Sequence, residues 1–324
     1  MEMLKSSASP TSQTLNSSRI VAELWFSDGT IIVENGESMF KLYSGLLARK
    51  SSVFRDMLTF PQPDGDGGVQ TVRLYDSTEA LTAFFKAIFD PEFFEPPPSK
   101  TDLDTIGNIL RLSTKYNTQY LRKRALLHIE TTYPSLLTAW NRRDADRTIP
   151  AIVYSPFAVL PLVREFELSW ALPAVLYCLC SHSVSQILDG VYWCEQPISI
   201  NAEDQKRILV GRAELVHLQN NLSLACLRQP SYPDCISSSE CTERRRKWLN
   251  VVSGWDIADP LDCLIENMDN ALKMDLCLGC FTQLKSNYYE EAQMEIWDQL
   301  PRIFGLSPWA DLLALKEEAM SFEW

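Results

Sequence analysis

Four cysteines in the second half of the chain have the residue type and spacing of a metal site. Cys277 and Cys280 form a C-x-x-C turn, in which two thiolates can bind the same ion. Cys235 and Cys241 flank a serine-rich stretch upstream and would supply the other two ligands. Four thiolates around one ion is the ligand set of a structural zinc site. One interpretation of these four positions is therefore a structural zinc site.

A second interpretation of the same cysteines stays open. The C-x5-C spacing of the upstream pair is looser than that of common zinc knuckles. Leu276, Leu278 and Phe281 give the downstream pair an apolar setting, in which unligated thiols also pack well. A thioredoxin-like redox pair is less favoured, because no βαβ pattern surrounds the C-x-x-C turn.

The rest of the chain offers little for catalysis. Its histidines, His128, His182 and His217, lie in separate segments, and the chain has no HExxH, G-x-S-x-G or P-loop motif. Cys178, Cys180 and His182 have a ligand-like spacing, but residues two apart on a helix point about 200° from one another. We expect these side chains to pack in a core and the protein not to be an enzyme. An enzyme without a recognisable motif is the competing class.

Charge argues against nucleic acid as a partner. The 324 residues carry a net charge of -12, which repels phosphate backbones. The one dense basic run, Arg244 to Lys247, is expected to form the solvated face of a helix. Its alternative is a DNA-contacting patch on a transcription-linked regulator.

The sequence predicts an intracellular protein, cytoplasmic and/or nuclear, with no membrane association. It has no apolar run of about 18 residues, so no membrane span is expected. Residues 1–19 are mostly small and polar, lack the apolar centre of a signal peptide and are expected to form a disordered tail. Nine unevenly spaced cysteines suit a reducing compartment better than a disulfide framework.

The predicted fold class is α+β. The elements of the first domain follow from alternating and helical apolar patterns. They are strands over 20–26, 30–33 and 69–74, and helices over 39–47, 51–58, 101–115 and 120–132, with one more beginning after Ser77. The Asp28-Gly29 pair predicts a turn that joins the first two strands into a hairpin. We therefore expect a three-stranded sheet covered by helices.

Over residues 20–132 this order resembles the BTB (POZ) domain. The residues that carry the resemblance are Glu23, Asp28, Gly29, Leu46, Leu47, Ala48, Ser51, Val53, Phe54, Met57 and Leu58. Glu23 stands where the family usually has Asp, and Tyr43 where it usually has His. Both departures change the polar groups of the family's central pocket.

The resemblance implies a non-catalytic protein-interaction module, a scaffold or adaptor. Members of the family self-associate or dock on protein partners, including cullin-type ubiquitin ligases. The residues expected nearest to a partner surface are Val53, Phe54, Met57 and Phe60. A homodimer is expected to be weak, because residues 1–19 have no apolar period for an additional helix. Cullin binding is weakly indicated, because the TFPQP stretch after residue 58 offers Phe60 without an acidic neighbour.

The second domain, 133–324, is expected to be mainly α-helical. A hydrophobic helix pair over 156–180 is predicted to break at Pro161 and Pro173. Residues 202–219 suit an amphipathic helix, with Ile208, Leu209, Leu215 and Val216 on its apolar face. The C-terminal part, from Trp297 to Trp309, resembles the corresponding region of fungal BTB-domain proteins.

Overall fold

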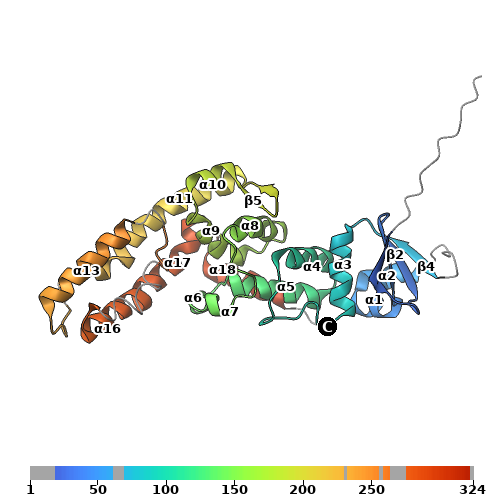
Figure 1. Ribbon diagram of the computed structural model, residues 1–324, viewed down its shortest axis with the longest axis horizontal. Helices are drawn as coiled ribbons and strands as arrows, with labels where there is room; N and C mark the ends of the chain where they lie inside the picture. The colour runs from blue at the N-terminus through green and yellow to red at the C-terminus, as the bar shows by residue number, and fades with distance from the viewer. Residues whose placement is uncertain (1–18, 61–68, 230–231, 255–257, 263–274, 322–324) are drawn as a thin grey trace, which may run out of the picture. The chain divides into compact units, whose positions relative to one another are not determined.

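The computed structural model describes residues 19–60, 69–229, 232–254, 258–262 and 275–321. The chain divides into two compact units (Figure 1). Within the described residues, the first unit falls in 19–95 and 104–122, and the second in 96–103 and 123–321. Residues 123–132, which the sequence analysis placed in the first domain, are grouped with the second unit. The predicted disordered tail lies outside the described residues except for Arg19, which begins a strand.

The first unit contains a four-stranded sheet rather than the predicted three. The strands are β1 (Arg19–Trp25), β2 (Ile31–Glu34), β3 (Ser38–Leu42) and β4 (Gln70–Arg73), in the spatial order β1-β3-β2-β4. β2 and β3 are antiparallel, whereas β1 pairs in parallel with β3, and β4 with β2. The sheet is therefore mixed, with its one hairpin at the centre.

That hairpin is not the one expected from the sequence. The predicted pairing of 20–26 with 30–33 through Asp28-Gly29 is wrong, because β1 and β2 are not neighbours. The turn is Asn35-Gly36, where Gly36 has φ of 88° and the Asn35 side chain accepts from the backbone N–H of Ser38 at 2.8 Å. Residues expected to begin a helix, such as Phe40, instead alternate inward along β3.

Helices of the first unit close over the sheet. They are α1 (Ser44–Lys50), α2 (Ser52–Thr59), α3 (Thr78–Phe89), α4 (Leu103–Lys115) and the start of α5 (Gln119–Thr132). Two of these helices begin at a serine cap, since Ser51 Oγ accepts from the N–H of Phe54 and Ser77 Oγ from that of Ala80. Ser51 Oγ also donates to the carbonyl of Tyr116 at 2.5 Å, which ties α2 to the end of α4. A core of aromatic rings fills the space between.

The second unit is mainly helical, as expected. After α5 come α6 (Leu137–Trp140), α7 (Arg143–Asp146), α8 (Ser155–Glu165), α9 (Leu172–Cys180), α10 (Val184–Asp189), α11 (Ala202–Leu218), α12 (Ala225–Arg228), α13 (Ser238–Ser253), α16 (Leu278–Ser286), α17 (Gln293–Ile303) and α18 (Trp309–Met320). A small hairpin, β5 (Val191–Trp193) with β6 (Gln196–Ile198), was not predicted. Together the two units give the α+β class. Among the described residues, no helix combines the length and apolar content needed to cross a membrane.

Two sequence expectations in this unit need correction. Pro161 lies inside α8 and does not break it, whereas Pro173 stands in the first turn of α9, where its missing N–H costs nothing. In α11, Ile208 and Leu215 are buried as expected, but Val216 is 43% exposed and does not belong to the buried face.

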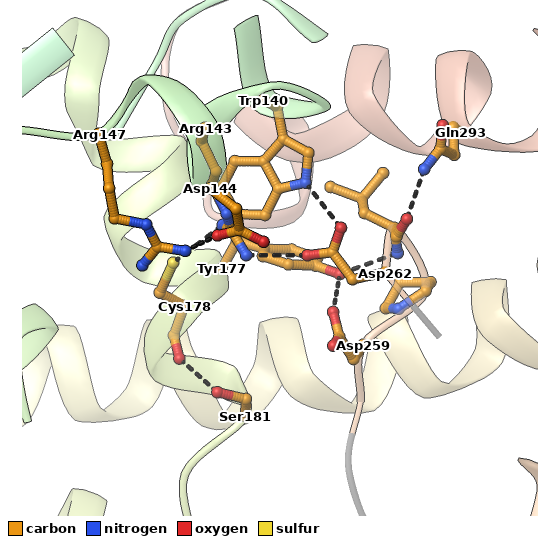
Figure 2. Close-up of polar contacts among 12 residues, drawn as sticks. Trp140, Arg143, Asp144, Arg147, Tyr177, Cys178, Ser181, Asp259, Asp262 and Gln293 are labelled. Atoms are coloured by element: carbon orange, nitrogen blue, oxygen red, sulfur yellow. Dashed lines mark hydrogen bonds and ion pairs between the residues drawn. The ribbon is translucent and has the colours of Figure 1, made fainter. Parts of the chain in front are cut away.

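A short segment, 258–262, is held inside the second unit by side chains from several elements (Figure 2). Tyr177 Oη accepts from the N–H of Leu261 at 2.9 Å. Tyr288 Oη donates to the carbonyls of Pro260 at 3.0 Å and Leu261 at 2.8 Å, and Gln293 Nε2 donates to the same Leu261 carbonyl at 2.5 Å. Side chains thereby satisfy the carbonyls of Pro260 and Leu261 and the N–H of Leu261, in a segment that is not part of a helix or sheet.

Two π-helical stretches also contact this segment. They are η2 (Gln219–Ser223), which continues α11, and η4 (Asn287–Ala292), which continues α16. Ser223 Oγ donates to the carbonyl of Pro260 at 2.9 Å, and the Gln219 side chain accepts from the N–H of Asp259 at 2.8 Å. The two π-helical stretches pack against each other, so the segment sits over their junction.

Candidate metal centre

The four predicted cysteines converge in the second unit. Their sulfur atoms all lie within 4.8 Å of one another. Cys235 lies in the loop before α13, Cys241 in the first turn of that helix, Cys277 at the N-cap of α16 and Cys280 in its first turn. The two helices lie side by side at one end of the unit and share a hydrophobic cluster (Figure 1). Four cysteines from two distant segments thus form a group that could hold a metal ion.

The sulfur spacing suits a tetrahedral ion. A zinc–sulfur distance of about 2.3 Å places the sulfurs of a tetrahedral site roughly 3.8 Å apart. The sulfurs of Cys277 and Cys235 are 3.9 Å apart. The ligand atoms are therefore already close to the positions that the ion would require.

A glycine in the C-x-x-C turn allows this convergence. The turn reads Cys277-Leu278-Gly279-Cys280, and helix α16 begins within it, so the second cysteine returns to the same side one turn later. A Cβ on Gly279 would lie 2.5 Å from the carbonyl oxygen of Asp234, a distance that real Cβ atoms do not show. Only glycine therefore lets the loop that carries Cys235 approach α16.

Backbone N–H groups prepare one of the ligands for ionisation. The N–H of Cys280 has the largest effect on the pKa of Cys277, and with the N–H of Ile236 and hydrogen bonds from the Cys280 and Cys241 side chains it lowers this pKa to about 6, although burial acts in the opposite direction. The N–H of Cys277 in turn points at the sulfur of Cys241, 3.5 Å away. Cys277 is consequently a thiolate at neutral pH.

The two buried cysteines behave in the opposite way. Burial raises the pKa of Cys280 to about 12 and also raises the pKa of Cys241. Neither ionises at neutral pH unless a cation compensates the charge in this apolar setting. A bound metal ion is such a cation, because coordination deprotonates a thiol outright.

The guanidinium of Arg245 lies beside these sulfurs. Its side chain is fully buried, and Nη1 lies 3.3 Å from the sulfur of Cys280. Nη2 donates to the carbonyl of Gln229 at 2.9 Å and to Thr242 Oγ1 at 3.2 Å, and the group lies 5.1 Å from the ring centre of Tyr232. Its positive charge would offset part of the negative charge of four thiolates around one divalent ion.

The basic run, Arg244 to Lys247, was predicted to form a solvated face, and this is wrong for Arg245, which is buried. Arg245 points into the core, while Arg244 donates to the carbonyl of Asp275. Lys247 pairs with Glu243 at 3.4 Å, and Arg246 is exposed. Residues four apart lie on the same face of a helix, so Arg245 shares the buried face of Cys241. Arg245 was not among the predicted site residues, and its spacing of four residues from Cys241 is the sequence signal that points to it.

The residues predicted to face a partner separate into two groups. Phe54 is fully buried and packs against Phe85 and Tyr116, with ring centres 6.2 and 4.8 Å away, so it is a core residue and not a surface one. Val53 and Met57 are half-buried on α2, and Phe60, at the C-cap of α2, is 66% exposed. The surface available to a partner is thus formed by the last three.

The other described histidines and cysteines do not converge as metal ligands. His128 is buried and its Nδ1 lies 2.8 Å from Thr148 Oγ1, and the ring of His182 packs edge-on against Phe157. Cys180 is buried and donates to a backbone carbonyl. Within the described ranges, neither Cys180 nor these histidines belong to a group of converging metal ligands.

Comparison of the chain with models of protein families, with characterised proteins and with solved structures finds no match. Its function is accordingly argued from the geometry above.

Proposed function

We propose that this chain is a non-catalytic protein-interaction scaffold, in which a BTB-type first unit binds protein partners and a structural zinc ion stabilises the second. The observation that carries the proposal is the group of four cysteine sulfurs within 4.8 Å of one another. A catalytic zinc keeps one coordination position for water or substrate, whereas four protein thiolates fill the tetrahedron. The ligand set therefore favours a structural ion.

The environment of the thiols favours zinc over unligated cysteines. Four thiolates and one Zn²⁺ carry a net charge of -2, which is costly in an apolar cluster unless a cation lies close by. Arg245 is placed there, fully buried, with Nη1 3.3 Å from Cys280. A buried guanidinium has a clear role beside a metal–thiolate cluster and a weaker one beside neutral thiols.

The interaction role rests on the first unit. After β1, its elements are a hairpin, a helix pair, a strand and further helices. The BTB resemblance implies the same succession, except that the hairpin joins β2 and β3 instead of the first two strands. Phe60 exposes two thirds of its surface at the end of α2, next to the half-buried Val53 and Met57. Such an apolar surface with polar surroundings is typical of a protein-binding site.

Metal analysis tests the zinc. Protein purified under reducing conditions should contain about one equivalent of zinc per chain and release it when the thiols are modified. Cys277→Ser should lose the metal, whereas Cys194→Ser should keep it, because Cys194 is exposed and outside the cluster. Freshly reduced wild-type protein without metal would rule out the site.

Affinity capture with a cullin tests the interaction role in its most specific form. Phe60→Glu should abolish capture of the cullin by the full chain. Tyr75→Glu is the matched control, because Tyr75 is another exposed aromatic residue of the first unit, 87% exposed. If neither wild type nor control binds at micromolar concentration, the adaptor role fails, and a light-scattering mass then tests self-association as the remaining scaffold role.

A further inference from the structure

A cavity of about 380 Å³ opens in the second unit, well separated in sequence from the cysteine cluster. It lies among the end of α5, helix α7, the start of α8 and the end of α9, with Asp259 of the 258–262 segment at its edge. The volume is within the range of small-molecule sites. Its lining combines two arginines with several hydroxyl groups and an apolar wall.

One of the two arginines is firmly held. Arg143 Nη2 forms an ion pair with Asp262 at 2.9 Å, and its guanidinium stacks 3.4 Å from the ring centre of Trp140 (Figure 2). Its Nη1 lies 3.7 Å from the sulfur of Cys178, which also lines the cavity. Arg143 therefore presents a fixed positive charge.

The other arginine has an exchangeable partner. Arg147 pairs with Asp144, three residues earlier, and the side chain of Asp144 is 77% exposed to water (Figure 2). An ion pair with so exposed a partner contributes little. Burial and the neighbouring Arg143 both lower the pKa of Arg147, which reflects two cations close together. A carboxylate inside the cavity can replace Asp144 and relieve this repulsion.

The other ionisable groups that line the cavity add one charge. Burial raises the pKa values of Tyr133, Tyr177 and Cys178, and it lowers that of His182, so all four are neutral at pH 7. Asp259 is the remaining charged group, and it accepts a hydrogen bond from Tyr177 at 2.6 Å. Asp262 already neutralises Arg143, and Asp144 pairs with Arg147, so a carboxylate enters the cavity only in exchange for the exposed Asp144.

A hydroxyl group in the lining is also unsatisfied. Thr132 is 8% exposed, and its Oγ1 has no hydrogen-bond partner within the part of the chain that the structure describes. The lining also contains an apolar group, Pro150, Ala151, Ile152, Val153 and Pro156. A ligand with one polar end and an apolar body matches this lining.

We propose that this cavity binds a small monocarboxylic acid, with its carboxylate at Arg147 and Arg143 and its apolar body against residues 150–153. Arginine suits this task because its planar guanidinium can bind a carboxylate through two parallel hydrogen bonds. Asp259 on the far side disfavours a second acidic group.

Ligand-observed ¹⁹F NMR with the full chain tests the proposal. The probes are 4-fluorobenzoate and its neutral counterpart, 4-fluorobenzamide. Benzoate should bind saturably and at least about tenfold more tightly than the amide, as expected for loss of one charge-assisted contact. Arg147→Gln should bring benzoate down to the affinity of the amide, and Arg147→Lys, which keeps the charge, should restore part of the difference.

Arg302→Gln is the matched control. Arg302 lines another cavity of about 380 Å³, together with Arg207 and Lys206, so this variant removes an equal charge elsewhere in the same unit. It should leave benzoate binding unchanged. Benzoate should also slow alkylation of Cys178 by iodoacetamide without protecting the exposed Cys194.

Four results would overturn the proposal. They are equal affinity for the two probes, no saturable benzoate binding, full binding by a folded Arg147→Gln variant, and an equal loss in Arg302→Gln. Circular dichroism of each variant establishes that it is folded before its affinity is compared.

Discussion

Arg245, on helix α13, contacts the cysteine cluster through its guanidinium. It is an arginine in a run of four basic residues, yet its guanidinium is buried and lies 3.3 Å from a cluster sulfur. A group that lies outside the ligand shell and compensates its charge commonly tunes metal affinity 10–100-fold. Its neighbour Arg246 is exposed and offers a matched comparison on the same helix.

We expect Arg245→Met to weaken zinc binding by about 10–100-fold, because the thiolates then lose their buried cation. Competition with a chromophoric chelator measures the zinc dissociation constant. Arg246→Met should leave it unchanged. Equal affinities for the two variants would mean that Arg245 acts on packing alone.

Adjacent threonines in α5 should respond oppositely to loss of the hydroxyl. Thr131 Oγ1 donates to the carbonyl of His128 at 2.8 Å, whereas Thr132 Oγ1 has no partner among the described residues. Thr131→Val should lower the free energy of unfolding by about 1 kcal/mol, and Thr132→Val should raise it by a similar amount. Urea denaturation of ligand-free protein measures both. Destabilisation by Thr132→Val would show that its hydroxyl is satisfied.

The sequence supports residue-level prediction only where a side chain has one common environment. Closely spaced cysteines have only a few common environments, and a metal site is one of them, so all four cluster cysteines could be named from the sequence. Arginine and phenylalanine have several: Arg245 was expected on a solvated face and is buried, and Phe54 was expected near a partner surface and lies in the core. In both cases the deciding fact is which side of a helix faces a core, and this depends on what packs there.

At the scale of elements, the metal centre depends on how closely the loop before α13 approaches the start of α16. The approach is set by Gly279, because any Cβ there would meet the Asp234 carbonyl at 2.5 Å. Gly254, at the end of α13, has only ordinary contacts around the corresponding position, the nearest at 3.5 Å. Replacing Gly279 by alanine changes both the contact with the loop and the freedom of the backbone, whereas replacing Gly254 changes only the freedom of the backbone.

Gly279→Ala should destabilise the zinc-bound protein by about 1–3 kcal/mol, the usual cost of forcing extra volume into a packed site. It should also weaken zinc binding, because the loop must move and takes Cys235 with it. Thermal unfolding with and without zinc measures both effects. Gly254→Ala should be neutral or slightly stabilising. A Gly279→Ala variant with wild-type zinc affinity would contradict the assigned role of the glycine.

The sheet shows why element pairing was harder to predict than element type. Asp28-Gly29 and Asn35-Gly36 are both hairpin signals, and only the second one closes a hairpin. The choice follows from β3, whose Phe40 and Leu42 are buried, and from two parallel pairings that join distant parts of the chain. Local patterns carry no information on such pairings, whereas helix caps such as Ser51 and Ser77 depend only on neighbouring residues.

At the scale of the whole molecule, the two units have separate cores and the cysteine cluster belongs to the second. Metal binding to the native state stabilises it by about 4 kcal/mol when the free ion is at 1,000 times its dissociation constant. The stabilisation should therefore reach the second unit and not the first.

Calorimetry with a zinc chelator should lower the temperature of one unfolding transition and leave the other unchanged. The shifted transition belongs to the second unit, because it contains all four cluster cysteines. In Cys277→Ser the chelator should have no effect on either transition. A shift of both transitions in wild type would indicate that the units unfold together, and no shift would indicate that metal does not contribute to stability.

The π-helical stretch at 219–223 has a consequence for the evolution of chain length in this region. A π-turn accommodates one residue more than an α-turn, and this one is followed directly by α12 and the loop that carries Cys235. Loss of that one residue, with return to an α-turn, should leave the side chains that follow in nearly the same directions, whereas loss of one residue from the α-helical part of α11 would rotate everything after it by about 100°. Residues 219–223 are therefore the place where the chain can lose a residue and still keep the cysteine cluster.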